Sequence, residues 1–549
     1  MIYILALFLV LAGLFVPSLE LIQVFRAIPT DKILLRQLIY GAALFRLGLV
    51  ALGAFVVLFG RNTAADLQLE QKQINIGASN KSIAILLTFL LILAAVLRLY
   101  QLDRGLWYDE IRTYVNYASR PIGEIITTYG SENQHPLYTI LAHASLCIFG
   151  EGAWSLRLPA ALLGVGSIGG LYLLGRQVAN AREALLSAAL LSFSYYHIWF
   201  SQNARGYTGL LFWTVLSSWL LLRALRKEKL RTWIFYAGAT AMGVYTHITM
   251  LFVIAGHLVV SIIAGWNSFR RPQWIRVFFG FGMTGLFTFQ LYALVMPQFL
   301  SRIGEDTRVL LWKSPLWTVL ELIRGTQVSF ASTLAAIVAL FVFSLGLLSL
   351  ARDHSVIVPL LLFPTMLGSA VVLGMGHPLW PRFFFFALGF VTLVAVRGTM
   401  KLGEIAVKFF RSNVNTVSAG TVFCGILILF SALTVPSAYG PKQDYDGALA
   451  FLEQNQEPGD AIITIGVTTF PYQNFYKKNW QTVKTLDSLR AVRQTAKRTW
   501  LVYAFPVAMQ YEYPEIMGSI ERDFKMIRRF GGTLKDGTIF VCRSDRSTF

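Results

Sequence analysis

Apolar residues follow one another along this chain in long runs, and short polar stretches separate the runs. A helix needs about 17–25 apolar residues to cross a hydrocarbon layer of roughly 30 Å. Thirteen runs reach or approach that length, and we interpret them as membrane-spanning helices. They cover residues 2–24, 36–60, 83–100, 157–175, 184–200, 207–222, 232–247, 249–266, 277–296, 328–350, 355–375, 383–397 and 417–436.

One further apolar run, residues 137–149, is too short to cross the layer comfortably. We expect it to form a helix that lies in the membrane interface. This interpretation matters for the orientation of the chain, because one additional crossing would exchange the two sides of the membrane for every later segment.

Lysine and arginine concentrate in four short connections, 176–182, 223–231, 270–276 and 397–411. Basic loops beside spanning helices face the cytoplasm, and all four can do so only if 137–149 does not cross. Thirteen crossings then place the N-terminus in the cytoplasm and the C-terminal region outside. The outward segments are 101–156, 201–206, 297–327, 376–382 and everything after residue 436.

Residues 437–549 have a different pattern, with short helical and strand periods, and are interpreted as a small outward α/β domain. About 110 residues are enough to bury a core. Helices are predicted at 444–455 and 486–496, strands at 461–465 and 500–503, and a hairpin at 528–530 and 538–542 that turns at Lys535-Asp536-Gly537.

Composition supports a membrane protein, since 55% of the 549 residues are hydrophobic and only 14% are charged. Soluble domains carry about 25% charged residues, so a soluble enzyme and a disordered chain are excluded. The net charge of +19 raises the question of nucleic acid, but the basic residues form no stripe, and no nucleic-acid partner is predicted. Cys147, Cys424 and Cys542 lack the spacing of a metal site or a disulfide framework.

The outward loop 101–156 carries an adjacent acid pair, Asp109 and Glu110. Acids beside a bilayer are costly and usually functional. Such a pair is compatible with a general base, with a metal ligand or with an ordinary solvated loop end. Trp107 and Tyr108 directly precede the pair and are residue types that lie at headgroup depth, which favours a functional role.

Further motifs follow the acid pair in a fixed order. They are Asn133-Gln134-His135-Pro136-Leu137-Tyr138, Trp154-Ser155-Leu156-Arg157-Leu158-Pro159, Ser201-Gln202-Asn203-Ala204-Arg205-Gly206-Tyr207 and Tyr245-Thr246-His247. Each motif is weak by itself, but the ordered set resembles the family 39 glycosyltransferases. These are the bacterial relatives of the protein O-mannosyltransferases and of the lipid A aminoarabinose transferase. The resemblance covers about residues 83–400.

The resemblance implies a GT-C fold in a bacterial cytoplasmic (inner) membrane. It also implies inverting transfer of a sugar from a polyprenyl-phosphate carrier to an envelope lipid, glycan or protein acceptor on the outer face. Asp109 stands where the family has its catalytic acid, and Glu110 is its companion. The residues expected to contact substrate are Tyr108, His135, Gln202, Arg205, Tyr207, His247 and Arg382.

Arg205 and Arg382 are the candidates for holding the carrier phosphate, because a guanidinium group binds phosphate through two hydrogen bonds. Arg382 precedes a phenylalanine run, as in family members, although an interfacial arginine that only snorkels has the same appearance. Tyr207 and Asn203 stand where relatives have acidic residues. No cofactor or metal is therefore predicted to be obligatory, and a role for a divalent cation is left open.

Two alternatives accompany this interpretation. A transporter or flippase of lipid-linked sugars would have inverted repeats and mid-membrane charges, whereas no repeat is visible and Arg46 is the one clear mid-span charge. The other is an oligosaccharide or polymer transferase of the same fold. The predicted parts of the chain are residues 1–60, two additional N-terminal transmembrane helices; 61–82, a cytoplasmic linker; 83–436, the GT-C transmembrane core; and 437–549, the outward α/β domain.

Overall fold

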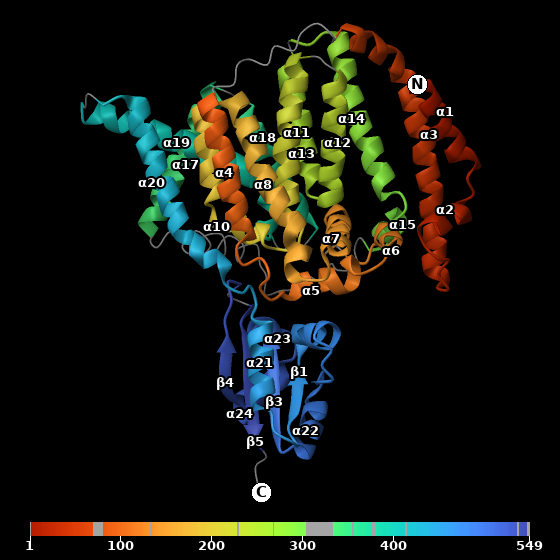
Figure 1. The fold of residues 1–549 in the computed structure, drawn as a ribbon, viewed down its shortest axis with the longest axis vertical. Coiled ribbons are helices and arrows are strands. Elements are labelled where there is room, and N and C mark those ends of the chain that lie inside the picture. The colour runs from red at the N-terminus through yellow and green to blue at the C-terminus, as the bar shows by residue number, and fades with distance from the viewer. Residues whose placement is uncertain are drawn as a thin grey trace. The chain divides into compact units, whose positions relative to one another are not determined.

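The computed structural model is mainly helical and contains one five-stranded sheet (Figure 1). The chain divides into two compact units. The helical unit comprises residues 1–100, 121–141 and 158–435, and the sheet unit comprises 101–120, 142–157 and 436–549. The structure describes all residues except 1, 70–80, 132–133, 228–229, 267, 303–332, 354–355, 376–378, 412–413, 535–536 and 546–549.

The helical unit begins with α1 (Ile2–Phe15), α2 (Ser18–Phe25) and α3 (Lys32–Leu69). The predicted single run 2–24 is in fact broken, because α1 and α2 meet at an angle of 105°. Pro17 lies at the break and has no N–H group with which to continue the hydrogen bonds of α1. Helix α3 also continues to Leu69, beyond the predicted start of the linker.

Arg46 of α3 binds the end of α1. Its Nε donates to the carbonyl oxygen of Gly13 at 3.0 Å, and its Nη2 donates to that of Leu14 at 2.7 Å. The last carbonyls of a helix carry partial negative charge and have no partner within the helix. The one clear mid-span charge of the sequence therefore completes a helix end, so it no longer favours a transporter.

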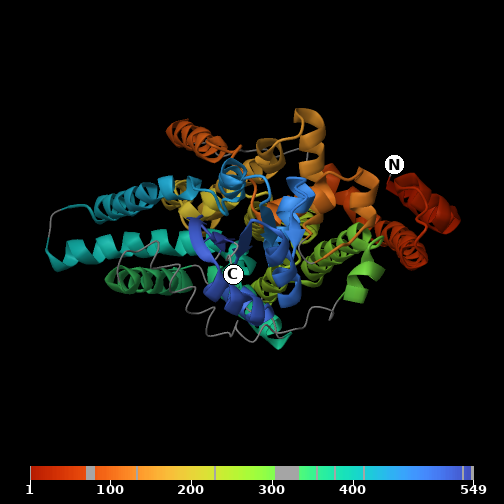
Figure 2. The same cartoon turned by 90° about the horizontal axis from the view of Figure 1, so that it is seen from below.

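The remaining helices of this unit run largely side by side (Figures 1 and 2). Among them α11 packs against α12, α12 against α14, α13 against α18, and α17 against α19. Wholly or partly in this unit are α4 (Lys81–Leu99), α6 (Ile122–Thr127), α7 (Pro136–Phe149), α8 (Ala153–Val178), α9 (Ala181–Ser192), α10 (Tyr195–Ser201), α11 (Tyr207–Lys227), α12 (Leu230–Thr246), α13 (Met250–Gly265), α14 (Arg271–Tyr292), α15 (Met296–Arg302), α17 (Thr333–Asp353), α18 (Ile357–Gly374), α19 (Leu388–Phe409), α20 (Thr416–Thr434) and the 3-10 helix η3 (Pro381–Ala387).

Seven described helices are long and apolar enough to cross a membrane, or up to nine if each of two bent pairs is one span. The second bent pair is α14 and α15, which meet at 85°. The predicted run 184–200 is two helices, because α9 ends at Ser192 and Ser194 caps the start of α10 by accepting a hydrogen bond from the His197 amide. The chain is a multi-pass membrane protein, while thirteen crossings and an interfacial position for α7 stay predictions.

The sheet unit contains α5 (Tyr108–Thr113), which continues directly into a π-helical turn, η2 (Tyr114–Ala118). Its strands have the order β2-β1-β3-β5-β4. Strand β1 is parallel to β2 and β3, whereas β5 is antiparallel to β3 and β4. The bounds are β1 (Ala461–Thr464), β2 (Gln481–Thr482), β3 (Arg498–Ala504), β4 (Lys525–Phe530), β5 (Ile539–Asp545), α21 (Tyr445–Asn455), α22 (Leu486–Thr495), α23 (Pro506–Glu512) and α24 (Pro514–Asp523).

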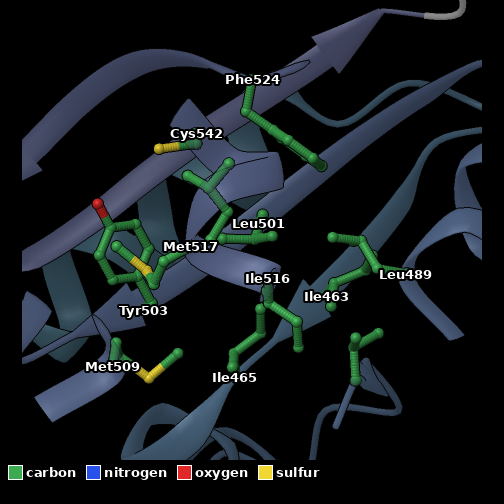
Figure 3. Packing of buried hydrophobic residues seen from close by; sticks show 12 residues of the cluster. Ile463, Ile465, Leu489, Leu501, Tyr503, Met509, Ile516, Met517, Phe524 and Cys542 are labelled. Carbon is green, nitrogen blue, oxygen red and sulfur yellow. The ribbon is translucent and has the colours of Figure 1, made fainter. Parts of the chain in front are cut away.

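The core of the sheet unit follows from strand register. Leu501 of β3 lies opposite Ile463 of β1 and Cys542 of β5, so the three side chains form one row on one face. Ile516 and Met517 of α24 cover that row, and all five side chains are buried in the same cluster (Figure 3). Packing of this row against the helix accounts for the amphipathic pattern of α24.

Most predicted elements of the C-terminal domain are present, and the hairpin strands are β4 and β5. The predicted helix 444–455 is α21, which begins after Asp444 because this side chain accepts a hydrogen bond from the Gly447 amide. Strand β2 and helices α23 and α24 were not predicted. The first has only two residues, too few for a visible period. The predicted turn residues 535–536 lie outside the described residues.

Candidate active site

Four of the predicted substrate-binding residues gather in the helical unit: His135, Arg205, Tyr207 and His247. The ring centroid of His135 is 5.3 Å from that of Tyr207 and 4.9 Å from that of His247. The guanidinium carbon of Arg205 lies 5.9 Å from the centre of the Tyr207 ring. His135 and Arg205 are only 4% and 2% exposed. We call these four residues, with Arg382, the cationic cluster.

Arg382 belongs to η3, and aromatic contacts place η3 beside the residues of the Arg205 turn. Phe385 of η3 lies 4.6 Å from Phe200 and 6.4 Å from Tyr207, measured between ring centroids. The guanidinium carbon of Arg382 is 4.9 Å from the Trp380 ring. Residues almost two hundred positions apart are therefore assembled by the packing of aromatic rings, which is worth about 0.5–1.5 kcal/mol per pair beyond burial.

His135 is uncharged at neutral pH, chiefly because it is buried. Burial holds the pKa of His135 well below its ordinary value, and the positive charges of Arg205 and Arg382 lower that pKa further. Its Nδ1 lies 3.2 Å from the carbonyl oxygen of Thr246, so we assign the proton of the neutral ring to Nδ1. The buried Nε2 is then an acceptor, and no described residue gives it a hydrogen bond.

Gln202 holds the turn that carries Arg205. Its side-chain amide donates to the carbonyl oxygens of Arg98 at 3.2 Å and of Tyr100 at 2.6 Å, at the end of α4. At position 206 the turn packs closely against its neighbours and leaves little room for a side chain. A Cβ added to Gly206 would lie 3.0 Å from the Thr246 carbonyl oxygen and 3.1 Å from His135 Nδ1. The structure therefore gives Gln202 an anchoring contact, and its predicted contact with substrate stays a prediction.

A buried arginine fixes the helix before this turn. Arg98 is fully buried and donates to the carbonyl oxygens of Ala94, Leu191 and Ser192. Its Nη2 lies 2.6 Å from His197 Nδ1, and the other ring nitrogen of His197 lies 2.9 Å from the Ser167 hydroxyl. This network ties α4 and α8 to α10, and α10 leads directly into the turn.

In the sheet unit, Glu110 and Arg157 form a buried ion pair with two hydrogen bonds. Arg157 Nε donates to Glu110 Oε1 at 2.7 Å, and Arg157 Nη2 donates to Oε2 at 2.5 Å. The same guanidinium donates to the backbone oxygens of Leu102, Arg104 and Gly105. Arg157, from the Leu-Arg-Leu-Pro motif, thereby holds both ends of the loop that leads to Asp109.

Asp109 lies in the first turn of α5, one residue before the paired Glu110, and is half-buried. Glu110 Oε2 also accepts a hydrogen bond from the Trp107 amide at 3.3 Å, which caps the helix start. Thr113 Oγ1 donates to the Asp109 carbonyl at 2.9 Å. The backbone of Asp109 is thus fixed by its neighbours.

Residues 441–443 link this loop to the C-terminal strands. The Gln443 side chain accepts from the Tyr108 amide at 3.1 Å and donates to the Gly537 oxygen at 3.4 Å. Lys442 beside it is only 7% exposed. The pKa of Lys442 is lowered to about 7, mainly by burial; Glu110 opposes this shift and Arg157 adds to it.

The acid pair is poorly suited to hold a divalent metal ion jointly. Both carboxylate oxygens of Glu110 accept hydrogen bonds from Arg157, and a hard cation takes six or more oxygens. Within the described ranges, no group of three or more His, Cys, Asp or Glu side chains is arranged to bind a metal.

Comparison with known proteins gives one family match. Residues 133–289, less than a third of the chain, match the family model of dolichyl-phosphate-mannose-protein mannosyltransferases. The chain is also 24% identical over 261 residues to YkcB of Bacillus subtilis (strain 168), a candidate mannosyltransferase. That alignment covers 45% of this chain, and the chain spans about a third (34%) of the length of YkcB.

Two solved structures can be compared with most of the chain. ArnT from Cupriavidus metallidurans, crystallised with undecaprenyl phosphate, has a TM-score of 0.48 at 14% identity, covering 86% of this chain and 99% of ArnT. The oligosaccharyltransferase AglB from Archaeoglobus fulgidus has a TM-score of 0.45 at 12% identity, covering 81% of this chain and 72% of AglB.

The family match confirms the relationship to glycosyltransferases that the ordered motifs predict. The matched region begins at Asn133 and includes His135, the turn with Arg205 and Tyr207, and His247. No role was predicted from the sequence for Arg157, Arg98 or Lys442. For Arg157, the Leu-Arg-Leu-Pro motif was the one available signal, because a charged residue at the start of an apolar helix needs a partner.

Replacing Arg157 by leucine is expected to destabilise the protein by about 3–5 kcal/mol, because Glu110 would stay buried without its partner. The matched control is Arg490→Leu, whose ion pair with Asp487 is exposed and is worth about 0–1 kcal/mol. Thermal unfolding of the purified protein in detergent measures both variants. Equal melting temperatures for the two variants would contradict the assigned role.

The buried Lys442 gives the stability a defined pH dependence. Its pKa is about 7 in the folded protein and about 10.4 in an unfolded chain, so between these values the unfolded state binds more protons. Stability then rises with pH across that window. We expect the stability advantage of Lys442→Met over the parent protein to shrink from pH 7 to pH 9. Parallel pH profiles of melting temperature would refute this.

Proposed function

We propose that this protein transfers a sugar, with inversion, from a polyprenyl-phosphate carrier to a lipid, glycan or protein acceptor. The reaction takes place at the outer face of a bacterial cytoplasmic membrane, with the N-terminus in the cytoplasm and the sheet unit outside. The general reaction is supported by the family match. The donor sugar and the acceptor are proposed only as classes.

The observation that carries this proposal is the cationic cluster. Arg205 is only 2% exposed, and the positive charges of Arg205 and Arg382 both lower the pKa of His135. Two positive charges that act on one buried ring create a local potential that attracts an anion. A carrier phosphate is such an anion, and two guanidinium groups can each bind it through charge-assisted hydrogen bonds.

The proposed reaction is a single displacement. The acceptor hydroxyl oxygen attacks the anomeric carbon from the face opposite the carrier phosphate, and a new carbon–oxygen bond forms. The bond between the anomeric carbon and the phosphate oxygen breaks, and its electron pair leaves with the carrier phosphate. The hydroxyl proton passes to the Asp109 carboxylate. One displacement inverts the anomeric configuration.

The chemical demands of this step match the proposed roles. The carrier phosphate is a good leaving group, so no strong general acid is required. Arg205 and Arg382 stabilise the charge that develops on it, and such preorganised electrostatic contacts are commonly the largest catalytic contribution. Asp109 is the general base, and Glu110 is assigned to positioning, since its carboxylate is bound to Arg157.

His135 has a separate proposed role. Its Nε2 is a buried acceptor without a hydrogen-bond partner among the described residues, and a neutral acceptor repels a phosphate oxygen. A hydroxyl group of the donor sugar can donate to it. Tyr207 and His247, whose rings contact His135, complete the proposed sugar pocket beside the phosphate.

Asp109→Asn is expected to lower transfer by about 10²–10⁴-fold, because an amide cannot accept the proton. Donor binding should stay within about twofold of the parent protein, since the base acts on the acceptor. The control is Asp487→Asn, whose side chain is 94% exposed. Incorporation of label from polyprenyl-phosphate mannose into membrane products measures the rate. Near-normal transfer by Asp109→Asn would remove Asp109 from the catalytic role.

Arg205→Lys and Arg382→Lys should each weaken binding of polyprenyl phosphate by about tenfold or more, since lysine cannot form the two-bond contact and each contact is worth about 1.5–3 kcal/mol. Arg276→Lys, in a predicted cytoplasmic connection, is the control. Transfer should continue in excess chelator. Loss of transfer in chelator, with recovery on adding Mg²⁺ or Mn²⁺, would show that a metal is needed and that these roles are wrong.

A further inference from the structure

The sheet unit contains a cleft at the carboxyl edge of its parallel strands. The cleft has a volume of about 240 Å³. Its lining includes residues that follow β1 and residues at the end of β2. Ligands of parallel sheets bind outside the carboxyl ends of the strands, where connections leave in opposite directions. The lining includes Tyr108, Gly466, Thr469, Phe470, Thr482 and Tyr513.

The backbone at this edge enters the left-handed region of φ at two positions. Gly466 has φ +61°, and an added Cβ would lie 2.7 Å from the Met509 sulfur. Phe505, directly after β3, has φ +56° although it is not glycine. This conformation is costly for a non-glycine residue such as Phe505 and concentrates at functional sites, whereas glycine adopts it readily. Of the two residues, Gly466 lines the cleft.

The chemistry of the lining fits a carbohydrate. Tyr108, Phe470 and Tyr513 provide aromatic rings, whose negative faces attract the C–H groups of a sugar ring. Thr482 and Asn474 add polar groups that can bind hydroxyls. The hydroxyl of Thr469 is buried and has no hydrogen-bond partner among the described residues. The cleft is smaller than the roughly 300–1,000 Å³ of drug-sized sites, which suits a single sugar ring.

A second cleft lies next to the first. It has a volume of about 540 Å³ and shares Asn474 with its neighbour. Tyr114 and Phe475, which contact each other at 5.8 Å between ring centroids, both line it. Tyr108 and Tyr114 come from α5 and η2, so both clefts border the same continuous helix. A ligand longer than one ring can therefore extend along that helix.

We propose that these two clefts bind a glycan acceptor, with one ring in the first cleft and the chain continuing into the second. The proposal rests on the proposed function, and it selects a glycan from the acceptor classes named above. Tyr108 lines the first cleft and directly precedes Asp109, whereas Asp109 is not part of the lining. In this arrangement the bound ring is the neighbour of the sugar that receives the transfer. The clefts position the acceptor and take no part in bond breaking.

Binding of neutral trisaccharides to the purified full-length protein in lipid nanodiscs tests this proposal. The probes are maltotriose, mannotriose and triacetylchitotriose, with a serine-rich peptide as the competing class, and saturation-transfer NMR gives the affinities. We expect at least one trisaccharide to bind. Phe470→Ala should weaken that binding at least tenfold and Thr469→Val several-fold. Tyr511→Ala, an exposed aromatic outside both clefts, should leave it unchanged.

Several outcomes would overturn the proposal: no binding of any trisaccharide, equal binding by all variants, or binding of the peptide alone. Thr469→Val keeps the test open if Phe470→Ala does not fold, because valine has nearly the same shape as threonine. Binding of undecaprenyl phosphate to the same preparations separates this proposal from the proposed function. Trisaccharide binding without carrier binding would refute the transferase while supporting a glycan site.

Discussion

The free-energy cost of burying a charge determines how several parts of this chain are packed. In an apolar environment an unpaired charge costs several kcal/mol, so each buried arginine shapes the structure around it. Arg98 binds backbone carbonyls and His197, and so fixes the helix before the Arg205 turn. Arg157 binds Glu110 and three carbonyls, and so shapes the loop of Asp109. In the cationic cluster, two arginines act on the same buried ring, and we propose that the phosphate of the substrate binds there.

These contacts separate positioning from chemistry. The adjacent acids Asp109 and Glu110 look equivalent in the sequence, but both carboxylate oxygens of Glu110 are bound to an arginine. One acid of the pair is therefore used to hold the backbone, and we assign proton transfer to the other. A similar division applies to the turn after α10, where Gln202 binds the end of α4 and Arg205 meets the rings of the cluster.

The sequence predicted the helical membrane fold, the C-terminal α/β domain and all five residues that form the cationic cluster. Long apolar runs and short strand periods are local signals, and they were sufficient for the element types. The break at Pro17, the partners of Arg157 and the burial of Lys442 depend on residues distant in the chain, and no local pattern reports them. The cleft beyond β1 was also missed, because β2 is too short to be recognised and the parallel arrangement could not be inferred without it.

The sheet unit connects the proposed acceptor site to the proposed base. Gln443 connects the Tyr108 amide to the C-terminal hairpin, and Tyr108 also lines the proposed glycan cleft. The loop that carries Asp109 is thus built into the same compact unit as the cleft. If the aromatic rings hold one sugar of the glycan, the hydroxyl of the next sugar is kept near the base. Such positioning lowers the entropic cost of bringing the acceptor and the base together.

The central claim is that the buried cations of the helical unit hold a lipid-linked phosphate. A cryo-electron microscopy structure of the protein in nanodiscs with undecaprenyl phosphate tests it most directly. We expect phosphate oxygens within hydrogen-bond distance of the guanidinium groups of both Arg205 and Arg382. Phosphate density that contacts neither arginine, or that is held through a metal ion bound to Asp109, would contradict it.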